Sequence, residues 1–116
     1  MANAFQTKTL KVTTTLTDLV PVYTTGQVVV HAVFISNRTT SDVKVDMGVY
    51  DGAGVLDANR QSWILYQTIV PPESTLTIEK PINLESSATD TEQRRVMSKA
   101  SGNSAIEILA SVLVIT

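Results

Sequence analysis

The sequence predicts an all-β protein, an antiparallel β-sandwich or jelly roll of about seven to eight strands. Three observations support this fold class. Val, Thr and Ile, which favour extended backbone, make up about a third of the 116 residues. Apolar residues recur with a period of two in several short segments. Clusters of Gly, Pro, Asn, Asp and Ser separate these segments at roughly ten-residue spacing.

The centre of the predicted fold is residues 25–51, two strands joined by a polar turn. Apolar side chains fall on both faces of residues 27–36, with Val28, Val30, Ala32 and Phe34 on one face and Val29, Val33 and Ile35 on the other. This pattern predicts a strand buried on both faces in the interior of a sheet, with Phe34 in the core. Residues 43–50 alternate more strictly, which indicates one covered face. Because residues 37–42 have the composition of a tight turn, the two strands are predicted to form a hairpin.

The remaining elements follow in order along the chain. Residues 7–16 are predicted as a half-buried strand and residues 18–23 as a short extended piece, which Pro21 places at an edge or bend. The pattern then predicts a turn at 51–59, a strand apolar on both faces at 62–70, short strands at 75–80 and 82–85, and a polar loop at 86–92. A strand at 93–100, a hairpin turn at 101–104 and a closing strand at 105–116 complete the chain. A helix is the alternative for 105–113, but the β-branched tail favours a strand.

Residues 7–116 are predicted to form a single domain, preceded by a flexible arm at residues 1–6. The arm is short and nearly uncharged, and Phe5 is its one large apolar residue. Such a segment cannot bury enough apolar surface to order itself. We therefore predict that Phe5 anchors the arm in a groove of a neighbouring subunit. The alternative is a disordered tail.

Composition excludes several classes of protein. A net charge of -2 gives no electrostatic reason to bind nucleic acid. The absence of cysteine excludes disulfides, thiolate zinc sites and a Cys nucleophile. The first residues contain no apolar run typical of a signal peptide, and no stretch approaches the roughly 18 apolar residues of a membrane helix. We expect a soluble protein that binds neither membrane nor nucleic acid.

No segment carries a catalytic motif, so we predict a protein without enzymatic activity, metal or cofactor. His31 is the single histidine and has no second metal ligand nearby, which favours a structural role over a catalytic or metal-binding one. Asp46, Asp51 and Asp57 lack the spacing of a calcium-binding loop. Residues 37–39 form a glycosylation sequon, but their composition favours turn chemistry.

One cluster of charges is a candidate for contact with a partner. Glu85 and Asp90 are followed by Arg94 and Arg95, an acid-then-base pattern. It fits either a solvated loop with local ion pairs or, together with Phe5, a partner-contact surface.

From Val22 onward, the order of segments resembles the small β-sandwich accessory proteins of tailed-phage virions. The residues that carry this resemblance are VVVHAVFISN (28–37), VKVDMGVYDGAG (43–54), VPPESTLTIEKPINLE (70–85) and EILASVLVIT (107–116). The sequence departs from that pattern in three places. Glu73 stands where glycine is common, residues 86–90 replace a shorter Gly-Asp turn, and Val114 replaces an acidic residue.

The resemblance implies a non-enzymatic structural protein located in the virion and made in the host cytoplasm. Its first expectation is a head decoration, or cement, protein that forms a homo-oligomer such as a trimer and contacts the major capsid protein. A tail, neck or fibre component that contacts a tail protein is an alternative. Another is a carbohydrate- or host-surface-binding module, for which Trp63 and Tyr66 are the close aromatic pair. An enzyme would require His31 to lie in a cleft.

Overall fold

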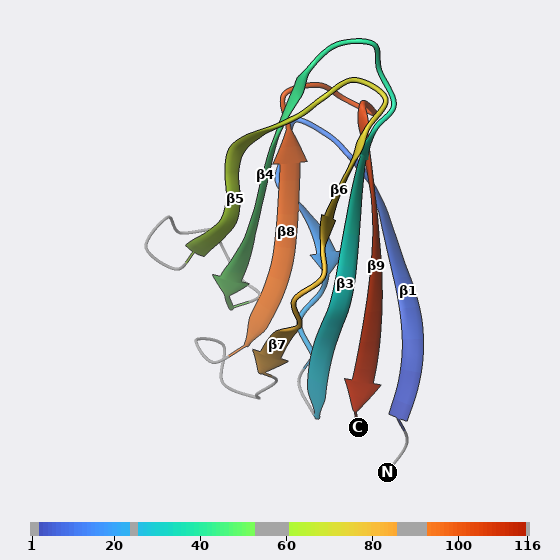
Figure 1. The fold of residues 1–116 in the computed structure, drawn as a ribbon. Helices are drawn as coiled ribbons and strands as arrows, with labels where there is room; N and C mark the ends of the chain where they lie inside the picture. The colour runs from blue at the N-terminus through green and yellow to red at the C-terminus, as the bar shows by residue number, and fades with distance from the viewer. Residues whose placement is uncertain (1–2, 24–25, 53–60, 86–92, 116) are drawn as a thin grey trace.

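The structure, a computed structural model, describes residues 3–23, 26–52, 61–85 and 93–115 of the chain. Two antiparallel sheets pack face to face, which confirms the predicted β-sandwich (Figure 1). The described residues form nine strands, one more than the largest number expected. They contain no helix long and apolar enough to cross a membrane.

The strands divide between two sheets, here called sheet A and sheet B. Sheet A has the spatial order β1 (Asn3–Val12), β9 (Ile106–Ile115), β3 (Gln27–Asn37) and β6 (Thr75–Ile78), and β7 (Ile82–Glu85) also pairs with β3. Sheet B has the order β2 (Thr17–Val20), β8 (Arg94–Ala100), β4 (Val43–Asp51) and β5 (Gln61–Val70). β3 therefore lies in the interior of a sheet, as predicted.

The hydrophobic core lies between the sheets and uses one face of each. Its most deeply buried members come chiefly from β3, β4, β8 and β9, and include Val28, Val30, Val33, Ile35, Val45, Met47, Val96, Ile106, Ile108 and Val112. Full burial of one such side chain stabilises the fold by roughly 1.5–3 kcal/mol. Packing therefore uses the inner faces and leaves the two outer faces available for binding.

A β-bulge in β3 overturns the prediction that this strand is buried on both faces. The pairing of β3 with β9 shifts between Val30 and Ala32, so His31 is an extra residue in the strand. Beyond the bulge, the inward positions are Val33 and Ile35, and Phe34 points outward with 40% of its surface exposed. The placement of Phe34 in the core is therefore wrong. A bulge reverses the alternation of side chains, which a strict period-two pattern cannot detect.

The prediction that the turns at 37–42 and 101–104 close hairpins is wrong in both cases, and for the same reason. Each connects strands of different sheets: β3 to β4 in the first case and β8 to β9 in the second. The connections β1–β2 and β5–β6 also cross between the sheets, and all four lie at the same end of the sandwich (Figure 1). Backbone hydrogen bonds join these connections, such as Arg38 N–H to the Ala105 carbonyl oxygen at 2.9 Å.

Asn37 organises this crossing end. Its side chain is buried, with 2% of the residue surface exposed. The amide Nδ2 donates hydrogen bonds to the carbonyl oxygens of Ser41 (2.8 Å) and Val70 (2.9 Å), and Oδ1 accepts one from the Thr39 backbone N–H (2.9 Å). The preference for turn chemistry over glycosylation at this sequon is confirmed, because the amide is buried and engaged in hydrogen bonds.

The described part of the predicted N-terminal arm is a strand rather than a flexible segment. Residues 3–6 belong to β1 and pair with residues 112–115 of β9, while residues 1–2 lie outside the described part. These four side chains are all exposed. Backbone pairing with β9, rather than burial of apolar side chains, orders these residues. Composition reports only on the side chains, so it indicated a free arm.

Candidate functional site

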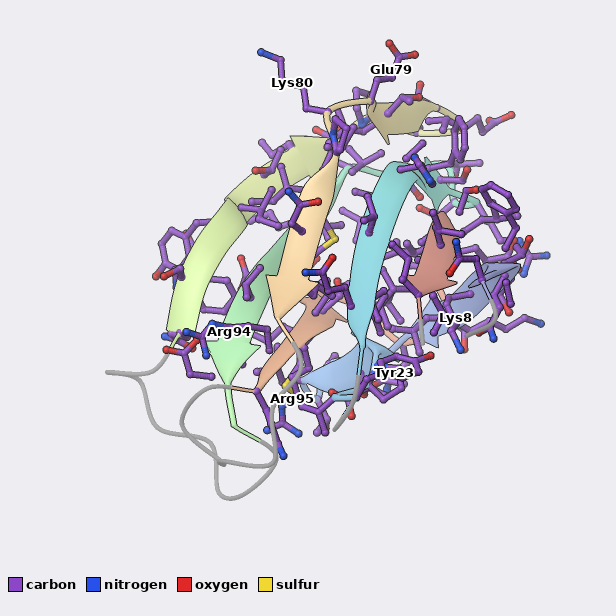
Figure 2. The ribbon with its side chains drawn as sticks, turned by 90° about the horizontal axis from the view of Figure 1, so that it is seen from below. Lys8, Tyr23, Glu79, Lys80, Arg94 and Arg95 are labelled. Carbon is purple, nitrogen blue, oxygen red and sulfur yellow. The ribbon has the colours of Figure 1, made fainter. Side chains whose placement is uncertain are left out.

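The structure places the predicted partner-contact residues at separate sites. Phe5 lies on the outer face of sheet A, whereas Arg94 and Arg95 open β8 in sheet B. Glu85 ends β7, but its side chain, like Asp90 as a whole, lies outside the described residues. Figure 2, a view from below, shows the two arginines apart from Lys8 of β1.

The two arginines form ion pairs within the chain. Arg94 Nε lies 3.1 Å from Asp51 Oδ1, and Arg95 Nη1 lies 3.7 Å from Asp18 Oδ1. Burial raises the pKa of the Asp18 carboxyl group, and the positive charge of Arg95 opposes this rise. These contacts link β8 to both of its neighbours in sheet B, so part of the charge cluster serves the fold.

His31 lies at the β3 bulge with its side chain exposed on the outer face of sheet A. Its ring centroid is 6.0 Å from that of Phe5. Within the described ranges, no group of three or more His, Cys, Asp or Glu side chains could hold a metal ion. His31 thus stands beside an aromatic ring on an open sheet face rather than in a cleft.

The outer face of sheet A carries exposed apolar side chains on three adjacent strands. Phe5 of β1 is 77% exposed, and Leu109 of β9 pairs with Phe34 of β3, both also exposed. A groove of about 390 Å³ runs across these strands, lined by Thr9, Leu10, Lys11, Phe34, Ser36, Glu107, Ile108 and Leu109. An exposed ion pair closes one end, with Arg38 Nη1 3.0 Å from Glu107 Oε1.

The outer face of sheet B carries an aromatic cluster. The Trp63 ring centroid lies 6.0 Å from that of Tyr50, with the rings nearly perpendicular, and 5.5 Å from that of Tyr66, with the rings at 45°. Tyr50 is buried and its hydroxyl donates a hydrogen bond to the Gln61 side chain. Tyr66 is 61% exposed. Burial and the nearby carboxylate of Asp46 raise the pKa of Tyr50.

Gly48 makes room for Trp63. A Cβ atom at Gly48 would lie 2.8 Å from the Ser62 carbonyl oxygen and 3.1 Å from Trp63 Cε3. Any larger residue at position 48 would therefore push the Trp63 indole of β5 away from the backbone of β4. Sequence analysis gave no reason to single out Gly48, because its role depends on the register between β4 and β5.

β5 is the edge strand of sheet B, and three of its apolar side chains, those of Ile64, Tyr66 and Ile69, are exposed. Its pairing with β4 shifts between Leu65 and Thr68. This irregularity gives Gln67 a positive φ of 48°, and the Gln67 N–H donates a hydrogen bond of 2.5 Å to Asp46 Oδ1. A second shift in the same pairing, between Trp63 and Leu65, leaves Ile64 as an extra residue, so the side chains of Trp63 and Tyr66, three residues apart, reach the same face.

A polar pocket of about 320 Å³ adjoins the bulge at Gln67. Its lining consists of Thr14, Lys44, Asp46, Gln67, Lys99, Ala100 and Ser101. Lys99 Nζ lies 3.9 Å from Asp46 Oδ2, so the carboxylate is held between a lysine and a backbone amide. The pocket offers charged and amide groups, and its lining residue Gln67 directly follows the exposed Tyr66, an arrangement suited to binding.

The sequence matches no family model and no curated protein. Among solved structures, the fold is similar to part of a chain in the crystal structure of the T13 IBDV viral particle, with a TM-score of 0.54 and 9% sequence identity. The match covers 97% of this chain and 30% of that chain, so this protein spans less than a third of its neighbour's length. At this identity the similarity concerns the fold.

Proposed function

We propose that this chain is a non-enzymatic structural protein of a virion and that it acts through protein–protein contacts. The observation that carries the proposal is the likeness of nearly the whole sandwich to part of a chain in a viral particle. The exposed apolar residues Phe5, Phe34 and Leu109 on sheet A supply a surface for such contacts. Several large exposed apolar groups on one face are a feature of interaction sites in soluble proteins.

The proposal extends to a specific place in the virion. The segments that resemble accessory proteins of tailed phages favour a head decoration protein that assembles as a homo-oligomer on the major capsid protein. Repeated attachment to a lattice requires a modest surface on each copy, because many symmetric contacts add together. A tail, neck or fibre protein would use the same surface at one location.

The outer face of sheet A has the composition of a protein interface. Leu109 lies between Thr9 and Phe34 in the strand register, and Lys11, Glu107 and Ser36 form the next row, where Glu107 pairs with Arg38. An apolar centre with a polar rim is the usual arrangement of protein–protein contacts. The edge strand β1 flanks this face, and its outer backbone groups are suited to pairing with another strand.

The test is attachment of the purified chain to virion heads that lack it, measured by co-sedimentation and by electron microscopy. Phe34→Asp should weaken attachment at least about thirtyfold, as expected for a hot-spot residue. Ile69→Asp is the matched control, because it places the same charge at an exposed apolar position of sheet B. Attachment at a single tail location would replace decoration with a tail role. Equal losses in the two variants would contradict the choice of sheet A.

A further inference from the structure

We infer that the outer face of sheet B is a second binding surface, and that its ligand is an acidic sugar residue of a glycan. The surface combines the aromatic pair Trp63 and Tyr66 with the polar pocket that contains Lys44, Asp46 and Lys99. It lies on the opposite sheet from the proposed protein contact and rests on separate observations.

The aromatic part of the site has the form of an open platform. The Trp63 indole lies against the backbone of β4 at Gly48, where the absence of a side chain lets the ring approach. Tyr66 stands beside it at 45°, with most of its surface exposed. A sugar ring has faces of C–H groups that carry partial positive charge, and these pack on the negative faces of aromatic rings.

The platform is held in place before any ligand arrives. Tyr50 packs edge-on against Trp63 and is itself fixed by its hydrogen bond to Gln61. The bulge that positions Tyr66 is fixed by the bond from Gln67 N–H to Asp46. A preformed site binds its ligand with little loss of side-chain entropy.

The adjoining pocket supplies the polar groups that a sugar requires. Its volume of about 320 Å³ lies at the small end of ligand pockets, which fits a single sugar residue. Lys44 and Lys99 bring two positive charges against the single carboxylate of Asp46. Asp46 is already paired with Lys99 and the Gln67 amide, so the remaining positive charge favours a sugar that carries a carboxylate.

A protein partner is the other conceivable occupant of a surface with an exposed tyrosine and a half-buried tryptophan. Hot spots in protein interfaces are fully desolvated and surrounded by apolar contacts. Here charged and amide groups converge on one small pocket beside the rings, and the ammonium group of Lys99 is accessible. Polar groups gathered at a small pocket, whose lining residue Gln67 follows Tyr66 in the chain, favour a small polyhydroxylated ligand.

Trp63 is the single tryptophan of the chain, so its fluorescence reports directly on the site. The full chain would be titrated with oligosaccharides of galacturonate, glucuronate and sialic acid, and with neutral cello- and malto-oligosaccharides. We expect saturable changes in emission with at least one acidic probe, at least about tenfold tighter than with the neutral ones. Tyr66→Ala and Lys99→Ala should each weaken this binding about tenfold or more, while Phe34→Ala on sheet A should leave it unchanged.

Three outcomes would overturn the inference. The first is the absence of a saturable change with every probe at millimolar concentration. The second is equal affinity for acidic and neutral probes, which would remove the role given to Lys44 and Lys99. The third is a Tyr66→Ala variant that loses attachment to virion heads but binds glycans normally, because the surface would then serve a protein. Glycan binding is measured on the isolated chain, so failure here leaves the proposed virion role untouched.

Discussion

Replacement of Asn37 by alanine tests how the two sheets are joined. The Asn37 side chain links the β3–β4 connection to the end of β5 through Val70. Alanine removes two donated hydrogen bonds and the two bonds that Oδ1 accepts from the Thr39 N–H and hydroxyl groups. It also leaves the Val70 carbonyl oxygen in buried surroundings without this donor.

The cost follows from these four hydrogen bonds. Each contributes a net stabilisation of about 0.5–1.5 kcal/mol, and three of the four are only partly buried, so we expect a loss of about 2–4 kcal/mol. A typical domain has only about 5–15 kcal/mol of stability in total. For a chain of this size the melting temperature should fall by about 4 °C for each kcal/mol, or about 8–16 °C.

The assay is thermal and urea denaturation followed by circular dichroism, with Arg38→Ala as the matched control. Arg38 is the next residue, and its ion pair with Glu107 is exposed, so its loss should cost at most about 1 kcal/mol. Asn37→Asp keeps an acceptor for Thr39 N–H but replaces both donors with a carboxylate that faces two carbonyl oxygens. It should be at least as destabilising as alanine. The reasoning fails if Asn37→Ala is no more destabilising than Arg38→Ala.

Three further predictions concern packing and ionisation. Phe34→Ala should cost clearly less than the roughly 3–5 kcal/mol of a core phenylalanine, and less than Ile35→Ala on the inner face, in the same denaturation assay. Gly48→Ala should destabilise the fold by about 1–3 kcal/mol and shift the Trp63 emission, because the added methyl meets the Ser62 carbonyl oxygen; unchanged emission and stability would refute this. The pKa of Tyr50 is raised in the folded state, so the stabilisation from this tyrosine is complete below its unfolded-state pKa near 10 and is lost as the pH rises through its folded-state pKa. Tyr50→Phe should therefore reduce the loss of stability at alkaline pH. It should also remove the last step of the tyrosinate absorbance titration.

The sequence by itself determined that the chain is a β-sandwich and located most of its strands. The alternation around Val45 and Met47 marks one buried face of β4, and the β-branched tail at Val112 and Val114 correctly favoured a strand over a helix. These signals are local, because alternation within a strand depends only on neighbouring residues. Similarly, the turn composition correctly located the breaks between strands.

The candidate site was predictable only in part. Sequence analysis noted Trp63 and Tyr66 as a close aromatic pair, but not the bulge that turns both rings to one face. Gly48 and Tyr50, which hold Trp63 in place, lie on another strand and gave no signal of their own. Phe5 was noticed for its apolar character, whereas its place in β1 depends on pairing with β9.

Only the tertiary structure decided which strands pair and which way their side chains point. A polar turn such as 38–42 has the same composition whether it closes a hairpin or crosses to the opposite sheet. The choice depends on contacts such as Arg38 N–H to Ala105, made with residues far along the chain. Likewise, the extra residue at His31 is set by the register with β9 and moves Phe34 from the core to the surface. Register is a property of two strands together, so neither strand encodes it alone.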